Sequence, residues 1–113
     1  MLLHFSVANN KFGVEGAKLL AEALHVNSSM KNLNLADNDL CGAKYKYIGG
    51  TYDPAGIKAI ADALSVSTSM TSLNVADNSL GRYYNGSKWV TDMAGIKAIA
   101  DALSVSTSMT SLK

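Results

Sequence analysis

Residues 55–73 read AGIKAIADALSVSTSMTSL, and residues 94–112 repeat them letter for letter, 39 positions later. A looser copy, EGAKLLAEALHVNSSMKNL, occupies residues 15–33. The first apolar residues of the successive units, Leu2, Met30, Met70 and Met109, are separated by 28, 40 and 39 residues. This spacing indicates a module of 28 residues with about a dozen residues inserted twice, and such periods are typical of repeat proteins.

Each module is expected to hold a short strand followed by a helix. Apolar residues alternate where the strand ends, as in Leu33-x-Leu35, which places both side chains on one face. The helix carries an apolar stripe at positions i, i+3, i+4 and i+7, made by Ile57, Ile60, Ala61 and Leu64. Its outer face carries pairs four residues apart that we expect mainly to solvate the surface: Lys18 with Glu22, Lys58 with Asp62, and Lys97 with Asp101.

Three asparagines occur at one fixed place in the modules. Asn10, Asn38 and Asn78 each follow three residues after the apolar pair of a strand. A buried amide can satisfy the backbone where the chain turns out of a strand, because it offers two donors and an acceptor. We therefore expect the three side chains to stack in one ladder across the modules.

These residues resemble the leucine-rich repeat family, in its ribonuclease-inhibitor type. The family pattern L-x-x-L-x-L-x-x-N-x-L-G is matched by LHFSVANNKFG, MKNLNLADNDL and MTSLNVADNSL, and its helix half by GAKLLAEAL and two copies of GIKAIADAL. The arrays of NOD-like receptors look similar. The resemblance implies an α/β solenoid with parallel strands on the concave face and helices on the convex face, and a protein that binds proteins and is not an enzyme. The implied single domain, residues 1–113, contains repeats 2–29, 30–69, 70–108 and a partial repeat 109–113.

The two insertions, about residues 43–55 and 82–94, depart from the family pattern and are typical of β-hairpins. Gly49-Gly50 and Asn85-Gly86 are the dipeptides that tolerate a two-residue turn. The implied registers place Tyr47 opposite Tyr52, Lys46 opposite Asp53, and Arg82 opposite Trp89, the last as a cation–π pair. We expect both hairpins to protrude side by side from the rim where strand passes to helix.

The insertions hold all five tyrosines, the only tryptophan and the only arginine of the chain: Tyr45, Tyr47, Tyr52, Tyr83, Tyr84, Trp89 and Arg82. These residue types are enriched in binding hot spots, so we list all seven as candidate partner-binding residues. An alternative remains open, since cross-strand aromatic pairs are also what a marginal hairpin needs to hold together.

A second candidate surface is the polar face of the strands. Asn34 and Asn74 occupy matching positions there, and Asp37 and Asp77 should be neighbours at one rim because parallel strands lie about 4.8 Å apart. A cation or a basic partner could bind at these carboxylates, although a solvated acidic edge is the simpler interpretation.

Composition excludes several classes. The 113 residues carry a formal charge of +1, and 48% are hydrophobic, which fits one globular domain with no basic nucleic-acid footprint. No apolar run spans a membrane and no signal peptide is visible, so a cytoplasmic location is expected.

The lone Cys41 has no base near it in sequence, and the histidines lack partners at ligand spacing, so no catalytic residue, metal or cofactor is predicted. Lys44, Lys46, Arg82 and Lys88 among aromatics form only a weak patch, which makes a nucleic-acid partner unlikely.

The ends of the stack lead to the remaining expectation. Each repeat buries its faces on its neighbours, so Val105, Met109 and Leu112 in the last unit should be partly exposed. Two compatible explanations follow: the chain is part of a longer array or receptor sensor, or it forms homo-oligomers through its open edges. The function predicted first is a protein-interaction scaffold that presents aromatic hairpins; the alternative is a structural self-assembly module.

Overall fold

The computed structural model describes residues 4–8, 10, 13–27, 29–42, 52–84 and 87–113, with residues 83 and 84 described by their backbone alone. Strand β1 (His4–Ser6) leads to helix α1 (Gly13–Val26), and β2 (Asn32–Asn34) precedes α2 (Ala55–Val66). Strand β3 (Ser72–Asn74) is followed by β4 (Arg82–Tyr84), β5 (Trp89–Thr91), α3 (Ala94–Val105) and β6 (Ser111–Leu112). The predicted alternation of strand and helix is therefore confirmed.

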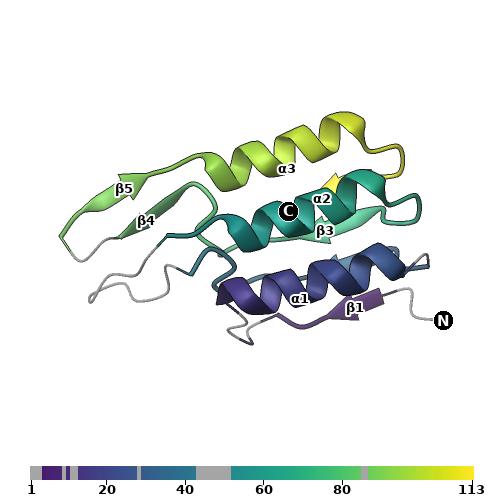
Figure 1. Cartoon of the computed structure of the whole chain (residues 1–113), viewed down its shortest axis with the longest axis horizontal. Coiled ribbons are helices and arrows are strands. Elements are labelled where there is room, and N and C mark those ends of the chain that lie inside the picture. The colour runs from purple at the N-terminus through teal and green to yellow at the C-terminus, as the bar shows by residue number, and fades with distance from the viewer. Residues whose placement is uncertain (1–3, 9, 11–12, 28, 43–51, 85–86) are drawn as a thin grey trace.

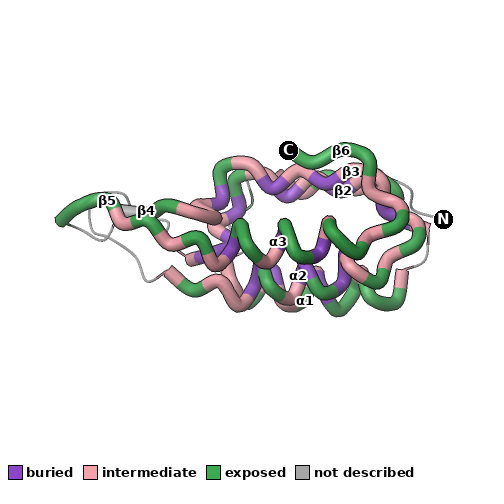
Figure 2. Tube along the Cα trace, turned by 90° about the horizontal axis from the view of Figure 1, so that it is seen from above, coloured by how far each residue is buried: buried purple, intermediate pink, exposed green. Residues whose placement is uncertain are grey.

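The molecule has two layers (Figures 1 and 2). Strands β1, β2, β3 and β6 form one parallel sheet in that order, and the three helices lie side by side against one of its faces. The register runs through matching positions of the modules, His4 with Asn32 and Asn32 with Ser72. The sheet thus joins modules that are 28 and 40 residues apart in sequence without a shift in register.

The core lies between the two layers and follows the predicted apolar stripe. Ile57 and Ile60 are fully buried, and Ala61 and Leu64 are only 4% and 3% exposed. Leu33, Leu35 and Leu73 meet them from the sheet. Burial of apolar surface contributes about 25 cal/mol per Å² to the free energy of folding. The contact between the apolar faces of the strands and helices is therefore the main favourable contribution that holds the modules together.

The predicted asparagine ladder is confirmed. The Oδ1 atom of Asn38 accepts a hydrogen bond from the Asn10 backbone N–H at 2.8 Å, and the Oδ1 atom of Asn78 accepts one from the Asn38 N–H at 2.8 Å. The Nδ2 group of Asn38 donates to the carbonyls of Val7, Leu35 and Ala36. The side chains of Asn38 and Asn78 therefore satisfy the backbone of their own turns and also join each of those turns to the preceding one.

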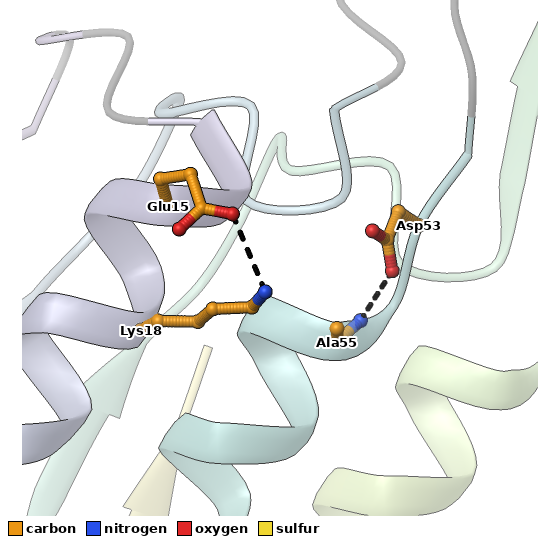
Figure 3. Close-up of polar contacts among 4 residues, drawn as sticks. All are labelled: Glu15, Lys18, Asp53 and Ala55. Atoms are coloured by element: carbon orange, nitrogen blue, oxygen red, sulfur yellow. Dashed lines mark hydrogen bonds and ion pairs between the residues drawn. The ribbon is translucent and has the colours of Figure 1, made fainter.

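The Lys18 pairing differs from the prediction. Its Nζ lies 3.3 Å from Glu15 Oε1, so Lys18 pairs with the acid three residues before it and not with Glu22 (Figure 3). Glu15 stands in the first turn of α1, where a carboxylate is also favoured by the helix dipole. Both side chains are substantially exposed, so the pair contributes little to stability.

Candidate protein-interaction site

The most prominent surface feature is the two-stranded antiparallel ribbon of β4 and β5, which extends beyond the N-terminal ends of the helices (Figures 1 and 2). Arg82 pairs with Thr91, and Tyr84 pairs with Trp89. The predicted register, with Arg82 opposite Trp89, is wrong by two residues. Pairing of Tyr84 with Trp89 leaves four residues, 85–88, between the strands where the Asn85-Gly86 signal predicted a two-residue turn.

The expected contact between Arg82 and Trp89 nevertheless forms. The Arg82 guanidinium carbon lies 4.5 Å from the centroid of the Trp89 ring, within the range of a cation–π interaction. The two residues are diagonal neighbours on one face of the ribbon, a separation that long and aromatic side chains span. Trp89 remains 48% exposed, so the ring presents surface to solvent while the cation holds its orientation.

The base of the ribbon is tied to the frame at the start of α3. The N–H of Asp92 donates to the Gly81 carbonyl at 3.0 Å, and the carboxylate of Asp92 accepts the N–H of Ala94 at 3.0 Å. A Cβ at Gly81 would come within 2.5 Å of the Ile96 Cδ1 atom, so only glycine fits there without a shift of Ile96. Asp53 makes the matching contact with Ala55 at the start of α2 (Figure 3).

Tyr52 is not exposed as a hot-spot residue would be, but lies against the repeat frame. Its hydroxyl donates to the Leu80 carbonyl at 2.7 Å and accepts the N–H of Gly95 at 3.1 Å. The side chain is partly buried and packs against the core. Tyr52 thus joins the end of the first insertion to the turn and helix of the next module.

Cys41 is fully buried beside Tyr52, and sequence reasoning did not find this pair. Burial raises the pKa of the Cys41 thiol to about 11, against a hydrogen bond with Tyr52 that lowers it. Burial likewise raises the pKa of Tyr52 to about 12. Both groups are therefore protonated at neutral pH, and this environment supports packing and not nucleophilic chemistry.

The rest of the first insertion, including Tyr45, Tyr47 and the expected pairs around Gly49-Gly50, lies outside the described residues. The backbones of Tyr83 and Tyr84 lie in β4. The structure therefore brings Arg82 and Trp89 together on the ribbon and places Tyr52 in the frame.

The second candidate surface is the sheet face that points away from the helices. Asn34 and Asn74 are register partners, and each side-chain carbonyl accepts the N–H two residues on, from Ala36 and Ala76, at 3.0 Å. His4 Nδ1 contacts the Nδ2 group of Asn32 farther along the same face. An open trough of about 700 Å³ runs across these strands, and its lining combines asparagine and serine side chains with apolar groups of Phe5 and three leucines.

Asp37 and Asp77 lie in adjacent turns, as expected, since the N–H of Asp37 donates to the Ala76 carbonyl at 2.9 Å. Both have positive φ angles, 55° and 57°, a region that aspartate tolerates better than most residues. The sequence analysis missed this backbone role. Within the described part of the chain, no three His, Cys, Asp or Glu side chains come together as a metal site would need.

The fold and these surfaces define a small α/β repeat domain of the leucine-rich-repeat-like class, with a parallel sheet covered on one side by helices. None of the described helices has the length and apolar character that a bilayer crossing requires. Neither a family model nor a curated protein matches the sequence. Among solved structures, the chain is similar to leiomodin-1 actin-binding site 2, with a TM-score of 0.70 and 25% identity over 96% of this chain. The match spans about half, 50%, of that other chain.

Proposed function

We propose that this domain is a non-enzymatic protein–protein interaction scaffold of the ribonuclease-inhibitor repeat type. The repeats supply a rigid frame, and the insertions present aromatic side chains to a protein partner. The observation that carries the proposal is the exposed Trp89 ring, held by Arg82 on a ribbon that projects from the frame. Trp and Arg are the residue types that most often dominate binding energy.

The proposed contact surface has two parts. The ribbon provides Arg82, Tyr83, Tyr84 and Trp89, and the first insertion adds Tyr45 and Tyr47, with Tyr52 acting from the frame as a positioning residue. The strand face provides Asn34 and Asn74, with Asp37 and Asp77 at its rim. The asparagine and serine side chains of the strands favour hydrogen bonds to a partner's backbone and polar side chains.

The likeness to leiomodin-1 actin-binding site 2 supports a protein partner and makes actin the first partner to test. Trp89 is the only tryptophan in the chain, so its fluorescence reports directly on the proposed surface. We expect added actin to change the Trp89 emission and to carry the domain into the pellet when actin filaments are sedimented.

Variants of the ribbon test which surface binds. Trp89→Ala and Arg82→Ala should each weaken binding by about tenfold or more, which corresponds to about 1.4 kcal/mol. Val66→Ala is the matched control, because Val66 is 65% exposed at the opposite end of a helix. Unchanged binding by the Trp89→Ala variant would exclude the ribbon as the contact surface.

A second experiment replaces both insertions with a linker like that of the first repeat, Gly13-Val14-Glu15. The frame should keep its circular dichroism spectrum, while partner binding should be lost. Retained binding in a folded frame would assign recognition to the strand face instead.

Self-association is a second candidate function, either as an assembly module or as one segment of a longer array. It is favoured by the apolar side chains at the last module, where Ile96 is 42% and Leu112 43% exposed. These side chains belong to a surface that is covered in the preceding module.

A further inference from the structure

The ribbon of β4 and β5 leaves the frame after Leu80 and rejoins it at Gly95, and one side chain from an earlier part of the chain contacts both places. The Tyr52 hydroxyl donates to the Leu80 carbonyl at 2.7 Å and accepts the N–H of Gly95 at 3.1 Å. These contacts link Tyr52 to residues 28 and 43 positions away in sequence. One hydroxyl therefore bridges the chain that enters the ribbon and the chain that leaves it.

The bridge adds to a hydrogen bond that belongs to the ribbon itself. The N–H of Asp92 donates to the Gly81 carbonyl at 3.0 Å, which joins the two sides of the ribbon just beyond the bridge. A bond between the two sides does not by itself fix the direction of the ribbon against the frame. The Tyr52 bridge supplies that second constraint, because its hydroxyl is attached to a ring that packs against the core.

The backbone next to Tyr52 is held in place as well. The N–H of Asp53 donates to the Cys41 carbonyl at 2.8 Å, and the carboxylate of Asp53 accepts the N–H of Ala55 at 2.9 Å, at the start of α2 (Figure 3). Tyr52 therefore reaches the ribbon from a position that is tied to the repeat frame.

A comparison of the two junctions between helices shows what Tyr52 replaces. A Cβ at Gly56 of α2 would lie 2.9 Å from the Val14 carbonyl oxygen of α1, and a Cβ at the equivalent Gly95 of α3 would lie 3.1 Å from the Tyr52 hydroxyl. The hydroxyl thus stands at the second junction where a main-chain carbonyl of the preceding helix stands at the first. Unlike a carbonyl, it can also donate, and it does so to the turn that leads into the ribbon.

The Tyr52 hydroxyl is a permanent donor at neutral pH. Burial raises the pKa of Tyr52 to about 12, so the proton of the bond to Leu80 is not lost in the physiological range. The side chain is partly buried, so it offers a partner less surface than the Trp89 ring does. Its contribution to recognition therefore passes through the ribbon.

We propose that Tyr52 fixes the direction of the ribbon, and so the presentation of Arg82 and Trp89 to a protein partner. It is a positioning residue that acts from the end of one insertion on the recognition surface carried by the next. This inference rests on the proposed function and adds the residue on which the geometry of the ribbon depends. A partner that binds a ribbon without this bridge has to order it first, which lowers the affinity.

Tyr52→Phe tests the proposal, since it keeps the ring and removes both hydrogen bonds. Trp89 is the only tryptophan, so its fluorescence anisotropy in the free protein reports on the motion of the ribbon. The variant should keep the circular dichroism spectrum of the unmodified chain but have a lower Trp89 anisotropy. Its binding to actin filaments, measured by sedimentation of the filaments, should weaken by about threefold or more.

Ser69→Ala is the matched control. The Ser69 hydroxyl donates to the Met30 carbonyl of the preceding module at 2.8 Å, so this variant also loses a bond from a hydroxyl to a main-chain carbonyl between modules. The contact follows the C-terminal end of α2, away from the ribbon. Trp89 anisotropy and partner binding should therefore stay unchanged. Equal effects of the two substitutions would mean that Tyr52 acts only on general stability, and would overturn the proposal.

The remaining outcomes separate this inference from the proposed function. Unchanged Trp89 anisotropy in a folded Tyr52→Phe variant would overturn the inference, whether or not the protein binds actin. A lower anisotropy with unchanged binding would also overturn it, because the direction of the ribbon would then be irrelevant to recognition. A lower anisotropy when the unmodified chain itself does not bind would support the control of the ribbon by Tyr52 and would exclude actin as the partner.

Discussion

Asn78 and Asn38 lie 40 residues apart in sequence, and the side-chain carbonyl of Asn78 accepts the backbone N–H of Asn38 at 2.8 Å. Both residues are buried, and each also donates to the backbone of its own turn. One amide therefore specifies a turn and its contact with the neighbouring module together.

Replacement of Asn38 by alanine should lower the free energy of unfolding by about 2–4 kcal/mol, because it leaves several buried backbone groups without partners. Urea unfolding followed by circular dichroism measures the change. Asn34→Ala is the control: Asn34 accepts a single local hydrogen bond, and its loss should cost about 1 kcal/mol. Equal losses in the two variants would contradict the role of the ladder.

The duplicated helices allow one substitution to be compared in two environments. Ile57→Ala should cost about 2–5 kcal/mol, since Ile57 is fully buried and its removal leaves a cavity. Ile96→Ala removes the same atoms from a side chain that is 42% exposed, and it should cost about 1 kcal/mol. Thermal unfolding at low protein concentration tests the difference. Similar costs at both sites would contradict the difference in burial between the two side chains.

Gly56→Ala should destabilise the protein, although alanine is the better helix former. A Cβ at this position would lie 2.7 Å from the Ala17 Cβ atom and 2.9 Å from the Val14 carbonyl oxygen. The resulting shift of α2 away from α1 should cost about 1–3 kcal/mol. Lys58→Ala, on the exposed face of the same helix, is the control and should change stability by less than about 0.5 kcal/mol. A stabilised Gly56→Ala variant would contradict the close contact.

Stability should fall at alkaline pH because of Cys41 and Tyr52. Burial raises the pKa of Cys41 from 9.0 to about 11, so the folded state keeps a proton that the unfolded chain releases. The contribution of Cys41 to the free energy of unfolding is complete below about pH 9 and is lost as the pH rises toward about 11. The contribution of Tyr52 is lost in the same way between pH 10.0 and about 12.

Urea unfolding at about pH 8 and about pH 10.5 measures this loss. The Cys41→Ala variant should be less stable than the unmodified chain at the lower pH, because it leaves a small cavity, but its stability should depend less on pH. An equal pH dependence in both proteins would exclude Cys41 as a source of the effect.

The periodic features of the fold could be predicted because they recur at fixed offsets in the sequence. Helix stripes such as Ile57 and Ile60, the parallel strands and the asparagine ladder all follow from residue type and spacing. The register of the ribbon could not be predicted, because the dipeptide Asn85-Gly86 favours a two-residue turn. The pairing of Tyr84 with Trp89 instead leaves a longer connection between the strands.

Other features depend on position in the stack. Tyr52 contacts a main-chain carbonyl and a main-chain N–H that lie 28 and 43 residues away, and backbone groups carry no sequence signal. Ile57 and Ile96 have identical neighbours in sequence but different exposure, because only one of them is covered by a further module.

The sheet register has a consequence for how such a protein can change. His4, Asn32, Ser72 and Ser111 align across the four strands, although the first module is about a dozen residues shorter than the next two. The point between the ladder asparagine and the helix is therefore a graft site, where loops of different length and chemistry are accepted without disturbing the scaffold. The loops can therefore vary in what they recognise while the repeats keep the architecture unchanged. This separation is the property sought in a scaffold for engineered binding loops.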